Sequence, residues 1–280
     1  MTIGIIGFGT MGSGIAQAAA KAGCTVHAFD IDKKFLKTNY EKLKKEIHTS
    51  IEKGKLTSKL GEEILSRIHP KNSLKDLAEC SIIIEAVVEN IQAKGELFKE
   101  LDLLTDKKTI LASNTSSISI TSIASHTKNP QRVIGLHFFN PAQIMKLVEV
   151  VKGFHTSEEI VNTSIEFAKS LGKTPVVCKD TPGFIVNRVA RPFYGEALRL
   201  LGEGVATVEE IDRIVKLEGG FKMGPFELMD LIGIDVNLAV TQSVYEQYFH
   251  EPRYRPHIIQ KKMVESNQLG RKTEKGFYEY

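Results

Sequence analysis

Two strand-like runs of this 280-residue chain carry an ionisable side chain where an apolar one would pack better. His137 ends one run, and Glu149 interrupts the other, Leu147–Val151. Burying a carboxylate is costly unless it is paired, and a histidine is an obvious partner. Such a pair would be a general base, in which the imidazole takes a hydroxyl proton while Glu149 fixes its tautomer and stabilises its cation. A structural, hydrogen-bonded histidine is the open alternative.

The N-terminal residues have the spacing of a dinucleotide-binding turn, G-x-G-x-x-G, at Gly7, Gly9 and Gly12. Gly7 would permit a tight turn, Gly9 would let the backbone approach a pyrophosphate, and Gly12 would let the following helix pack on the strand. The second strand-like run ends in Asp30, close to the spacing of about 20 residues expected for a ribose-binding carboxylate. A carboxylate there would repel a 2′-phosphate, so the sequence predicts NAD rather than NADP as the cofactor.

Two further polar groups are candidates for substrate contacts. The cluster Ser113-Asn114-Thr115-Ser116-Ser117 follows a strand-like run, and ligands of open α/β sheets bind outside the carboxyl ends of strands. One of its serines could donate a hydrogen bond to a substrate oxygen, although capping of the next helix would use the same hydroxyls. Asn187 stands near the start of a later helical segment, where it could face a cleft or simply cap the helix.

Composition limits the class of protein. The chain is 42% hydrophobic and 25% charged, which suits one large or two ordinary globular domains. Its 37 basic and 34 acidic residues leave a net charge of +3, too small to imply nucleic acid as the main partner. Three scattered cysteines indicate neither a disulfide framework nor a zinc site. No membrane-length apolar run or leader-like N-terminus is present, so we expect a cytoplasmic protein with no membrane partner and no metal.

The order of segments predicts an α/β fold. Apolar runs at residues 2–7, 25–30, 81–88, 109–113 and 133–138 alternate with longer amphipathic stretches, the pattern of a parallel sheet covered by helices. The pattern changes at Asp180-Thr181-Pro182-Gly183 and is mostly helical afterwards. We therefore expect two domains, at residues 1–180 and 181–280.

Five motifs in this order resemble the 3-hydroxyacyl-CoA dehydrogenase family, and especially its short 3-hydroxybutyryl-CoA dehydrogenases. They are the glycine turn, Ser-Asn-Thr-Ser-Ser, His-Phe-Phe-Asn-Pro, Val-Glu-Val-Val and Pro-Gly-Phe-Ile-Val-Asn-Arg, and the match continues to the C-terminal Phe277-Tyr278. The resemblance implies an N-terminal Rossmann-like, mostly parallel sheet with helices on both faces, followed by an all-α C-terminal domain that builds a homodimer.

The resemblance also implies site residues. It places the catalytic histidine on His137 and its partner on Glu149, the pair already suspected, and gives the contacts to the substrate oxygen to Ser116 and Asn187. Asn140 would support the loop that shapes the site. Glu89 and Lys94 would lie near the nicotinamide, unless they are only a charge pair at a helix start.

Residues 33–59 hold nine lysines against three glutamates, a local excess unlike the rest of the chain. Coenzyme A carries a 3′-phosphate and a pyrophosphate, so a basic helical hairpin would attract it. The resemblance makes Lys53 the best single candidate for a nucleotide contact, although any of these lysines could simply belong to a solvated face. One residue departs from the family pattern: Glu274 replaces a glycine of the C-terminal Lys-Thr-Gly-Lys-Gly-Phe-Tyr, which could shift that turn.

Taken together, the residues and the resemblance imply an enzyme that interconverts (S)-3-hydroxyacyl-CoA and 3-ketoacyl-CoA with NAD. Two other functions stay open: a dehydrogenase of another small 3-hydroxy acid, such as a sugar acid, and a non-catalytic dinucleotide-binding protein. The lysine-rich hairpin favours the acyl-CoA ester over the first, and the set His137, Glu149, Ser116 and Asn187 speaks against the second.

Overall fold

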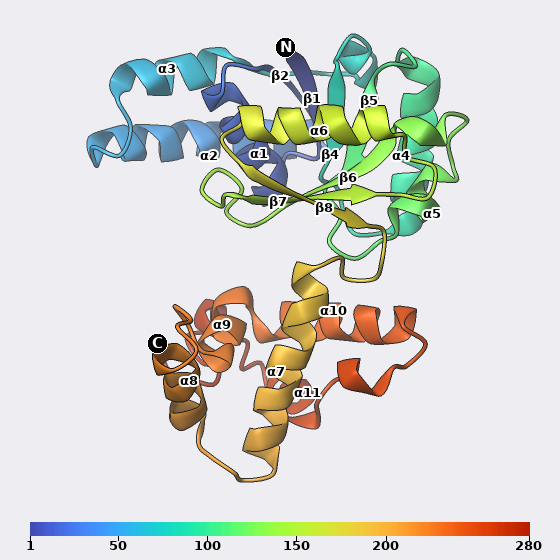
Figure 1. The fold of residues 1–280 in the computed structure, drawn as a ribbon. Helices are drawn as coiled ribbons and strands as arrows, with labels where there is room; N and C mark the ends of the chain where they lie inside the picture. The colour runs from blue at the N-terminus through green and yellow to red at the C-terminus, as the bar shows by residue number, and fades with distance from the viewer. The chain divides into compact units, whose positions relative to one another are not determined.

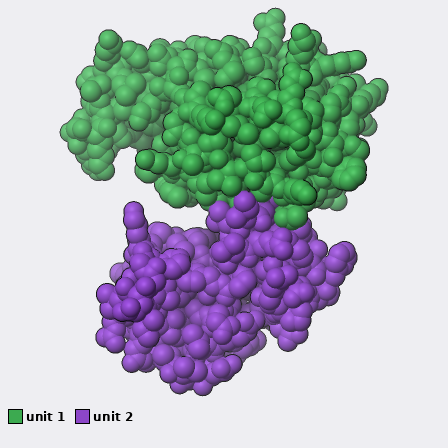
Figure 2. Space-filling model, viewed as in Figure 1, with its two compact units in different colours: residues 1–181 green, residues 182–280 purple.

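The computed structural model describes residues 1–280, which form two compact units, Met1–Thr181 and Pro182–Tyr280 (Figure 2). The division falls one residue after the expected boundary at residue 180. In neither unit is any helix both long enough and apolar enough to cross a lipid bilayer.

Unit 1 is built on one eight-stranded sheet in the order β3-β2-β1-β4-β5-β6-β7-β8 (Figure 1). Neighbouring strands run parallel except β6 and β7, which are antiparallel. The strands are β1 (Thr2–Ile6), β2 (Thr25–Phe29), β3 (Ile68–Pro70), β4 (Ile82–Glu85), β5 (Ile110–Ser113), β6 (Val133–Phe138), β7 (Leu147–Lys152) and β8 (Thr174–Lys179). The predicted α/β fold with a mostly parallel sheet is confirmed.

Helices cover both faces of this sheet, as expected (Figure 1). The helices of unit 1 are α1 (Thr10–Lys21), α2 (Lys33–Glu52), α3 (Ser58–Ser66), α4 (Ile91–Leu104), α5 (Ile120–Ala124) and α6 (Glu158–Ser170), with short 3₁₀ turns at Leu74–Leu77 and Pro130–Arg132. One face packs into a large apolar cluster with α1, α2, α3 and α6. On the other face α5 lies so close that a Cβ on Gly135 would come within 2.9 Å of Ile120.

Successive residues of a strand point to opposite faces, so each strand divides its side chains between these two layers. Ile84, Ala112 and Leu136 belong to the apolar cluster. Their neighbours Glu85, Ser113 and His137 therefore face the α5 side. Because Glu149 is the register partner of His137, it lies on that side too. The sheet thus collects these four polar residues on one face, on four adjacent strands.

Two strand predictions differ from the structure. The apolar run predicted at residues 81–88 ends as a strand at Glu85, because Glu85 turns back to accept a hydrogen bond from the Val87 amide at 2.7 Å. The edge strand β3 was not predicted. It is only three residues long and contains a proline, which removes a backbone donor.

Unit 2 is helical. Its helices are α7 (Val186–Gly202), α8 (Val208–Leu217), α9 (Pro225–Ile232), α10 (Ile234–Gln247) and α11 (Ile258–Glu265), with 3₁₀ turns at Pro252–Tyr254 and Arg271–Thr273. The core includes Tyr194, Leu198, Phe226 and Met229, packed between α7, α8 and α9. The predicted all-α second domain is confirmed.

Two buried carboxylates of unit 2 hold the C-terminal residues in place. Asp230 accepts hydrogen bonds from the amides of Phe277 and Tyr278, both at 2.9 Å. Asp212 accepts from the Tyr278 hydroxyl at 2.9 Å and from two amides at the start of α9. Glu274 adopts the left-handed conformation, at φ 59°, that a glycine would take at this position. The turn is therefore kept in spite of the substitution.

Glycine is required at position 276 of this turn, because a Cβ on Gly276 would lie 2.1 Å from Asp230 Oδ1. We predict that Gly276→Ala destabilises unit 2 by about 2 kcal/mol through overpacking, which lowers its melting temperature by roughly 5–10 °C. Glu274→Gly should change the stability by less than about 1 kcal/mol, since relief of left-handed strain and the added freedom of the unfolded chain oppose one another. Differential scanning calorimetry of both variants checks this, and equal melting temperatures for Gly276→Ala and wild type would contradict it.

Candidate active site

The turn between β1 and α1 requires glycine at two of its three glycine positions, Gly7 and Gly12. Gly7 has φ +85°, and a Cβ on it would lie 2.5 Å from the carbonyl oxygen of Ala86. A Cβ on Gly12 would lie 1.8 Å from the carbonyl oxygen of Gly7, so the helix packs directly on the turn. At Gly9, in contrast, a Cβ would meet only the Phe35 ring, at 3.9 Å. The backbone is thus open to an incoming group at Gly9.

The start of α1 suits a negatively charged group. Gly9 is the N-cap residue, no side chain caps the helix, and its first turn has no acidic residue. The unsatisfied amides and the helix dipole therefore favour an anion such as a pyrophosphate. Asp30 accepts hydrogen bonds from the amides of Phe8, at 2.8 Å, and Asp32, at 3.0 Å, one on each oxygen. Each oxygen keeps a lone pair for a ribose hydroxyl. These residues fit NAD.

The structure brings His137 and Glu149 into contact. The register of β6 and β7 places His137 opposite Glu149, and Nδ1 of the imidazole lies 2.7 Å from Glu149 Oε2. His137 is 6% exposed and Glu149 is 1% exposed. Because an ionised carboxylate can only accept a hydrogen bond, Nδ1 carries the proton in this contact. Nε2 is then the nitrogen that can exchange a proton with a bound molecule.

Glu89 organises the serine loop that follows β5. Its Oε1 accepts hydrogen bonds from the Thr115 hydroxyl at 2.5 Å, from the amides of Ser116 and Ser117 at 3.1 and 3.2 Å, and from the Ser117 hydroxyl at 3.0 Å. Burial would raise the pKa of Glu89, but the charge of Lys94 and these hydrogen bonds outweigh it and lower the pKa. Glu89 therefore stays ionised and fixes the backbone of Ser116.

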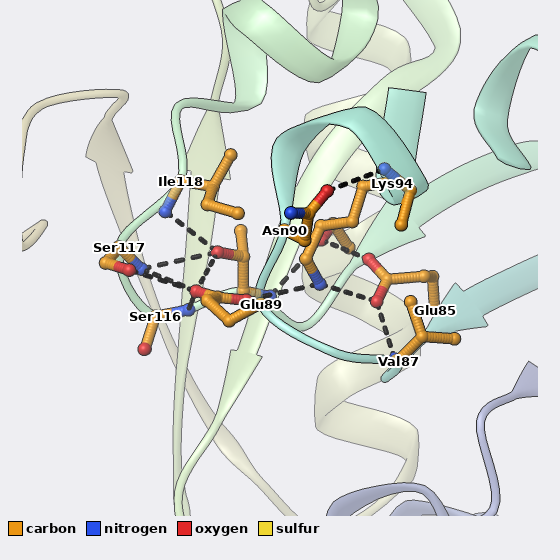
Figure 3. A network of polar contacts seen from close by, with 11 residues as sticks. Glu85, Val87, Glu89, Asn90, Lys94, Ser116, Ser117 and Ile118 are labelled. Carbon is orange, nitrogen blue, oxygen red and sulfur yellow. Dashed lines mark hydrogen bonds and ion pairs between the residues drawn. The ribbon is translucent and has the colours of Figure 1, made fainter. Parts of the chain in front are cut away.

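Lys94 sits between two carboxylates, as Figure 3 shows. Its Nζ lies 2.6 Å from Glu85 Oε1 and 3.2 Å from Glu89 Oε2, and its side chain is only 1% exposed.

Asn114 joins the serine loop to β6, because its Oδ1 accepts a hydrogen bond from the Phe138 amide at 2.8 Å. The loop of Ser116 and the strand of His137 are thus tied together.

A pocket of about 200 Å³ lies between α1, α2 and the loop from β6 to β7. Asn140, named from the sequence, is one of its lining residues, and so is Lys42. Lys53 is not: it caps the C-terminus of α2, where it is exposed. Lys173 holds the loop by donating hydrogen bonds to the carbonyl groups of Ala142, at 2.6 Å, and Met145, at 2.8 Å.

Asn187 belongs to unit 2, where it lies in the first turn of α7. No group of three or more histidine, cysteine, aspartate or glutamate side chains could hold a metal ion.

Sequence reasoning missed two residues of this site, Glu85 and Lys173, and it named Asn114 only as a member of the polar cluster after β5. Glu85 gives the same signal as Glu149, a carboxylate in an apolar run, and could have been found. Lys173 acts through contacts with a distant loop, so the sequence around it carries no comparable signal.

Comparison with known proteins agrees with this geometry. Residues 2–181 match the NAD binding domain of 3-hydroxyacyl-CoA dehydrogenase, and residues 183–280 match the C-terminal domain of the same enzyme. This chain belongs to the 3-hydroxyacyl-CoA dehydrogenase family. NAD, predicted from the glycine turn and Asp30, is the cofactor in the description of the matched domain.

Individual members of the family are similar over the whole chain. A probable 3-hydroxybutyryl-CoA dehydrogenase of Deinococcus radiodurans is 45% identical over 280 residues, which cover 100% of both proteins. The solved structure of (S)-3-hydroxybutyryl-CoA dehydrogenase from Ralstonia eutropha is 42% identical, with a TM-score of 0.94, over 100% of this chain and 98% of that one. A 3-hydroxyadipyl-CoA dehydrogenase of Escherichia coli K12 is 47% identical over 279 residues, and this chain spans 59% of its length.

Asp30 gives a testable cofactor preference. We predict that the protein favours NADH over NADPH by roughly 10- to 150-fold in kcat/KM, because NADPH loses a charge-assisted hydrogen bond and meets a repelling carboxylate. Asp30→Asn keeps an acceptor for one of the two backbone amides and should lower this ratio by about tenfold. The measurement is kcat/KM with each cofactor at fixed acetoacetyl-CoA. Equal values for the two cofactors in wild type, or an unchanged ratio in the variant, would show that Asp30 does not discriminate between them.

Proposed function

We propose that this protein is an NAD-dependent dehydrogenase that interconverts (S)-3-hydroxyacyl-CoA and 3-ketoacyl-CoA, with His137 as its general base. The observation that carries the proposal is the buried contact of 2.7 Å between His137 Nδ1 and Glu149 Oε2. It lies on a fold whose glycine turn and Asp30 fit a dinucleotide. The configuration and the short acyl group follow the printed names of relatives, which include an (S)-3-hydroxybutyryl-CoA dehydrogenase.

The chemistry divides between the cofactor and the chain. The cofactor held at the glycine turn would supply the hydride acceptor, NAD, for oxidation and the hydride donor, NADH, for reduction. His137 moves the accompanying proton: Nε2 takes it from the hydroxyl group during oxidation and gives it back during reduction. Glu149 holds the imidazole in the tautomer with a proton on Nδ1 and stabilises the imidazolium that forms. Since Glu149 is buried at 1% exposure, this charge acts with little screening by solvent.

Ser116 and Asn187 would hold the oxygen that changes between hydroxyl and carbonyl. Ser116 is suited to this role because Glu89 fixes its backbone amide at 3.1 Å, which holds the residue in a defined place. Asn187 offers an amide that donates to the carbonyl form and accepts from the hydroxyl form. Both assignments rest on the family resemblance.

The coenzyme A portion of the substrate would use the pocket between α1 and α2. Its lining is mostly polar and includes Lys42, Asn39 and Asn140, side chains that suit phosphate and amide groups. The remaining lysines of α2 add a positive field around it. Lys53 stands at the exposed end of α2, where it would meet the outermost phosphate.

The homodimer expected for the chain is also part of the proposal. Unit 2 exposes large apolar side chains on several of its helices, including Val189, Leu217, Leu231 and Val236. Exposed apolar side chains of this size favour association, and closed two-fold dimers are the commonest solution. We predict that sedimentation equilibrium at micromolar concentration gives twice the mass of the 31.1 kDa chain. A stable monomer under these conditions would remove the dimer from the proposal.

The activity itself is tested by oxidation of NADH with acetoacetyl-CoA, and by reduction of NAD with 3-hydroxybutyryl-CoA and 3-hydroxyadipyl-CoA. Activity with a CoA ester but not with free 3-hydroxy acids supports the proposal. Turnover of free acids alone would point to a sugar-acid type of dehydrogenase, and no turnover with any of them would point to a non-catalytic binding protein.

We predict that His137→Gln lowers the turnover rate at least about a hundredfold, because a positioned general base contributes a factor of roughly 10²–10⁴ to the rate. Glu149→Gln should lose somewhat less, since it removes the charge but keeps a hydrogen-bond acceptor. Single-turnover kinetics with acetoacetyl-CoA and NADH measure the chemical step directly, and circular dichroism checks the fold. Should His137→Gln keep a tenth or more of the wild-type rate for that step, another group must be the base.

A further inference from the structure

Glu85 is a completely buried carboxylate for which neither the sequence reasoning nor the proposed mechanism has a role. It ends β4, in the middle of the sheet, with an exposed fraction of 0%. Three donors surround it: Lys94 Nζ at 2.6 Å, the Val87 amide at 2.7 Å and the Ser113 hydroxyl at 2.6 Å. These three contacts replace the water that a buried carboxylate loses.

The contacts of Glu85 lead in two directions. Through Val87 it fixes the backbone of Ala86 and Val87, which lies against the glycine turn: a Cβ on Gly7 would be 2.5 Å from the Ala86 oxygen and 2.9 Å from the Val87 nitrogen. Through Lys94 it reaches Glu89, which accepts the amides of Ser116 and Ser117. Glu85 touches neither serine itself (Figure 3).

Lys94 needs both of its partners. Its ammonium is buried and has two anions within 3.2 Å, so the trio carries a net charge of −1. If Glu85 were neutral, Lys94 would be left with Glu89 alone and would be drawn towards it. A buried charge that loses one partner shifts or takes up water. The Glu89 carboxylate, which accepts hydrogen bonds from the serine loop, would then move towards Lys94, and its hydrogen bonds to the loop would weaken.

We propose that Glu85 is a positioning residue for the dehydrogenase reaction, coupling the dinucleotide-binding turn to the serine loop through Lys94 and Glu89. It does not contact the substrate or the reacting atoms. Glu85 fixes the position of Lys94 before the cofactor and substrate bind. Through Lys94 and Glu89 it also fixes the position of Ser116. This inference deepens the proposed function and rests on it for the roles of Lys94 and Ser116.

The test compares Glu85→Gln with Asp102→Asn. Asp102 is an equally buried carboxylate near the other end of α4, paired with Arg132 at 2.8 Å, and it contacts neither the serine loop nor the glycine turn. The two variants therefore lose the same kind of ion pair at two different places. We expect the melting temperature of both variants to fall, so an effect of lost stability alone would appear in both.

The first measurement is amide hydrogen exchange in the protein without cofactor. We expect the Ser116 and Ser117 amides to exchange about tenfold faster in Glu85→Gln and at the wild-type rate in Asp102→Asn. The second measurement is NADH affinity by fluorescence, with ADP-ribose as the ligand that lacks nicotinamide. Gln keeps an acceptor for the Val87 amide beside the glycine turn, so Glu85→Gln should weaken ADP-ribose by less than about threefold. It loses the charge facing Lys94, which the family resemblance places near the nicotinamide, so it should weaken NADH by about tenfold. If the serine amides or the NADH affinity respond alike in both variants, Glu85 is only a stabilising residue and the inference fails.

A double-mutant cycle with Lys94→Met tests the route. If Glu85 acts through Lys94, Glu85→Gln adds less than about twofold to the loss of NADH affinity already caused by Lys94→Met, whereas independent effects would multiply. If the two losses of NADH affinity multiply in the double variant, the proposed route through Lys94 is wrong. Should Glu85→Gln not fold, Glu85→Asp keeps the charge but draws it away from Lys94, which lies 2.6 Å from Glu85 in wild type, and should accelerate the same two amides by a few fold. Unchanged exchange in Glu85→Asp would then overturn the inference.

These readouts separate the inference from the proposed function. Exchange and binding are measured without any acyl-CoA, so they stand whatever the substrate proves to be. If wild type fails to oxidise NADH with acetoacetyl-CoA while the exchange result is as expected, the proposed function is wrong and the coupling by Glu85 is retained.

Discussion

The architecture of unit 1 depends on one constraint: a carboxylate inside a sheet must be compensated by a neighbour that is fixed in place. Glu85 and Glu149 are both almost without solvent contact, and each has a cationic or ionisable partner within 2.7 Å. The partners differ in kind. The lysine offers Glu85 an ammonium that can only donate hydrogen bonds. The histidine offers Glu149 a ring with a second nitrogen, the one used in the proton transfer that we propose for this site.

Strand periodicity lets the sheet carry both pairs without disturbing its core. Because side chains alternate between faces, the apolar cluster with α1 and α6 keeps every second residue, and the polar set occupies the other positions. The register then brings partners together across strands. Ser113 is opposite Glu85, and Glu149 is opposite His137. A polar site on one face therefore coexists with a continuous apolar layer on the other.

The sequence was most informative where a function depends on neighbouring residues. The glycine turn and the carboxylate at Asp30 have fixed spacings, and the strands beside them follow from apolar runs, so fold class and cofactor could be predicted. His137 and Glu149 were recognisable because each is polar in an apolar run. Glu85 has the same signal, but it was absorbed into a run extended to residue 88.

Contacts between distant segments could not be predicted in this way. The link from Asn114 to the Phe138 amide depends on how far β5 is paired with β6, which no local pattern fixes. Which lysine of α2 lines the pocket depends on the rotation of the helix against α1. The structure places Lys42 there and leaves Lys53 at the end of the helix. Short edge strands such as β3 escape detection because three residues carry too little periodicity.

The antiparallel pairing of β6 and β7 has a consequence for how the chain folds. Every other neighbouring pair in the sheet is joined across at least one helix, or across whole strands, whereas β6 and β7 are joined by residues 139–146 alone. Closing so short a loop costs little chain entropy, and hairpins form within about 1–10 μs. His137 and Glu149 thus meet through the most local strand pairing in the sheet. The parallel strands around them pair more slowly, because longer segments of chain must be brought together first.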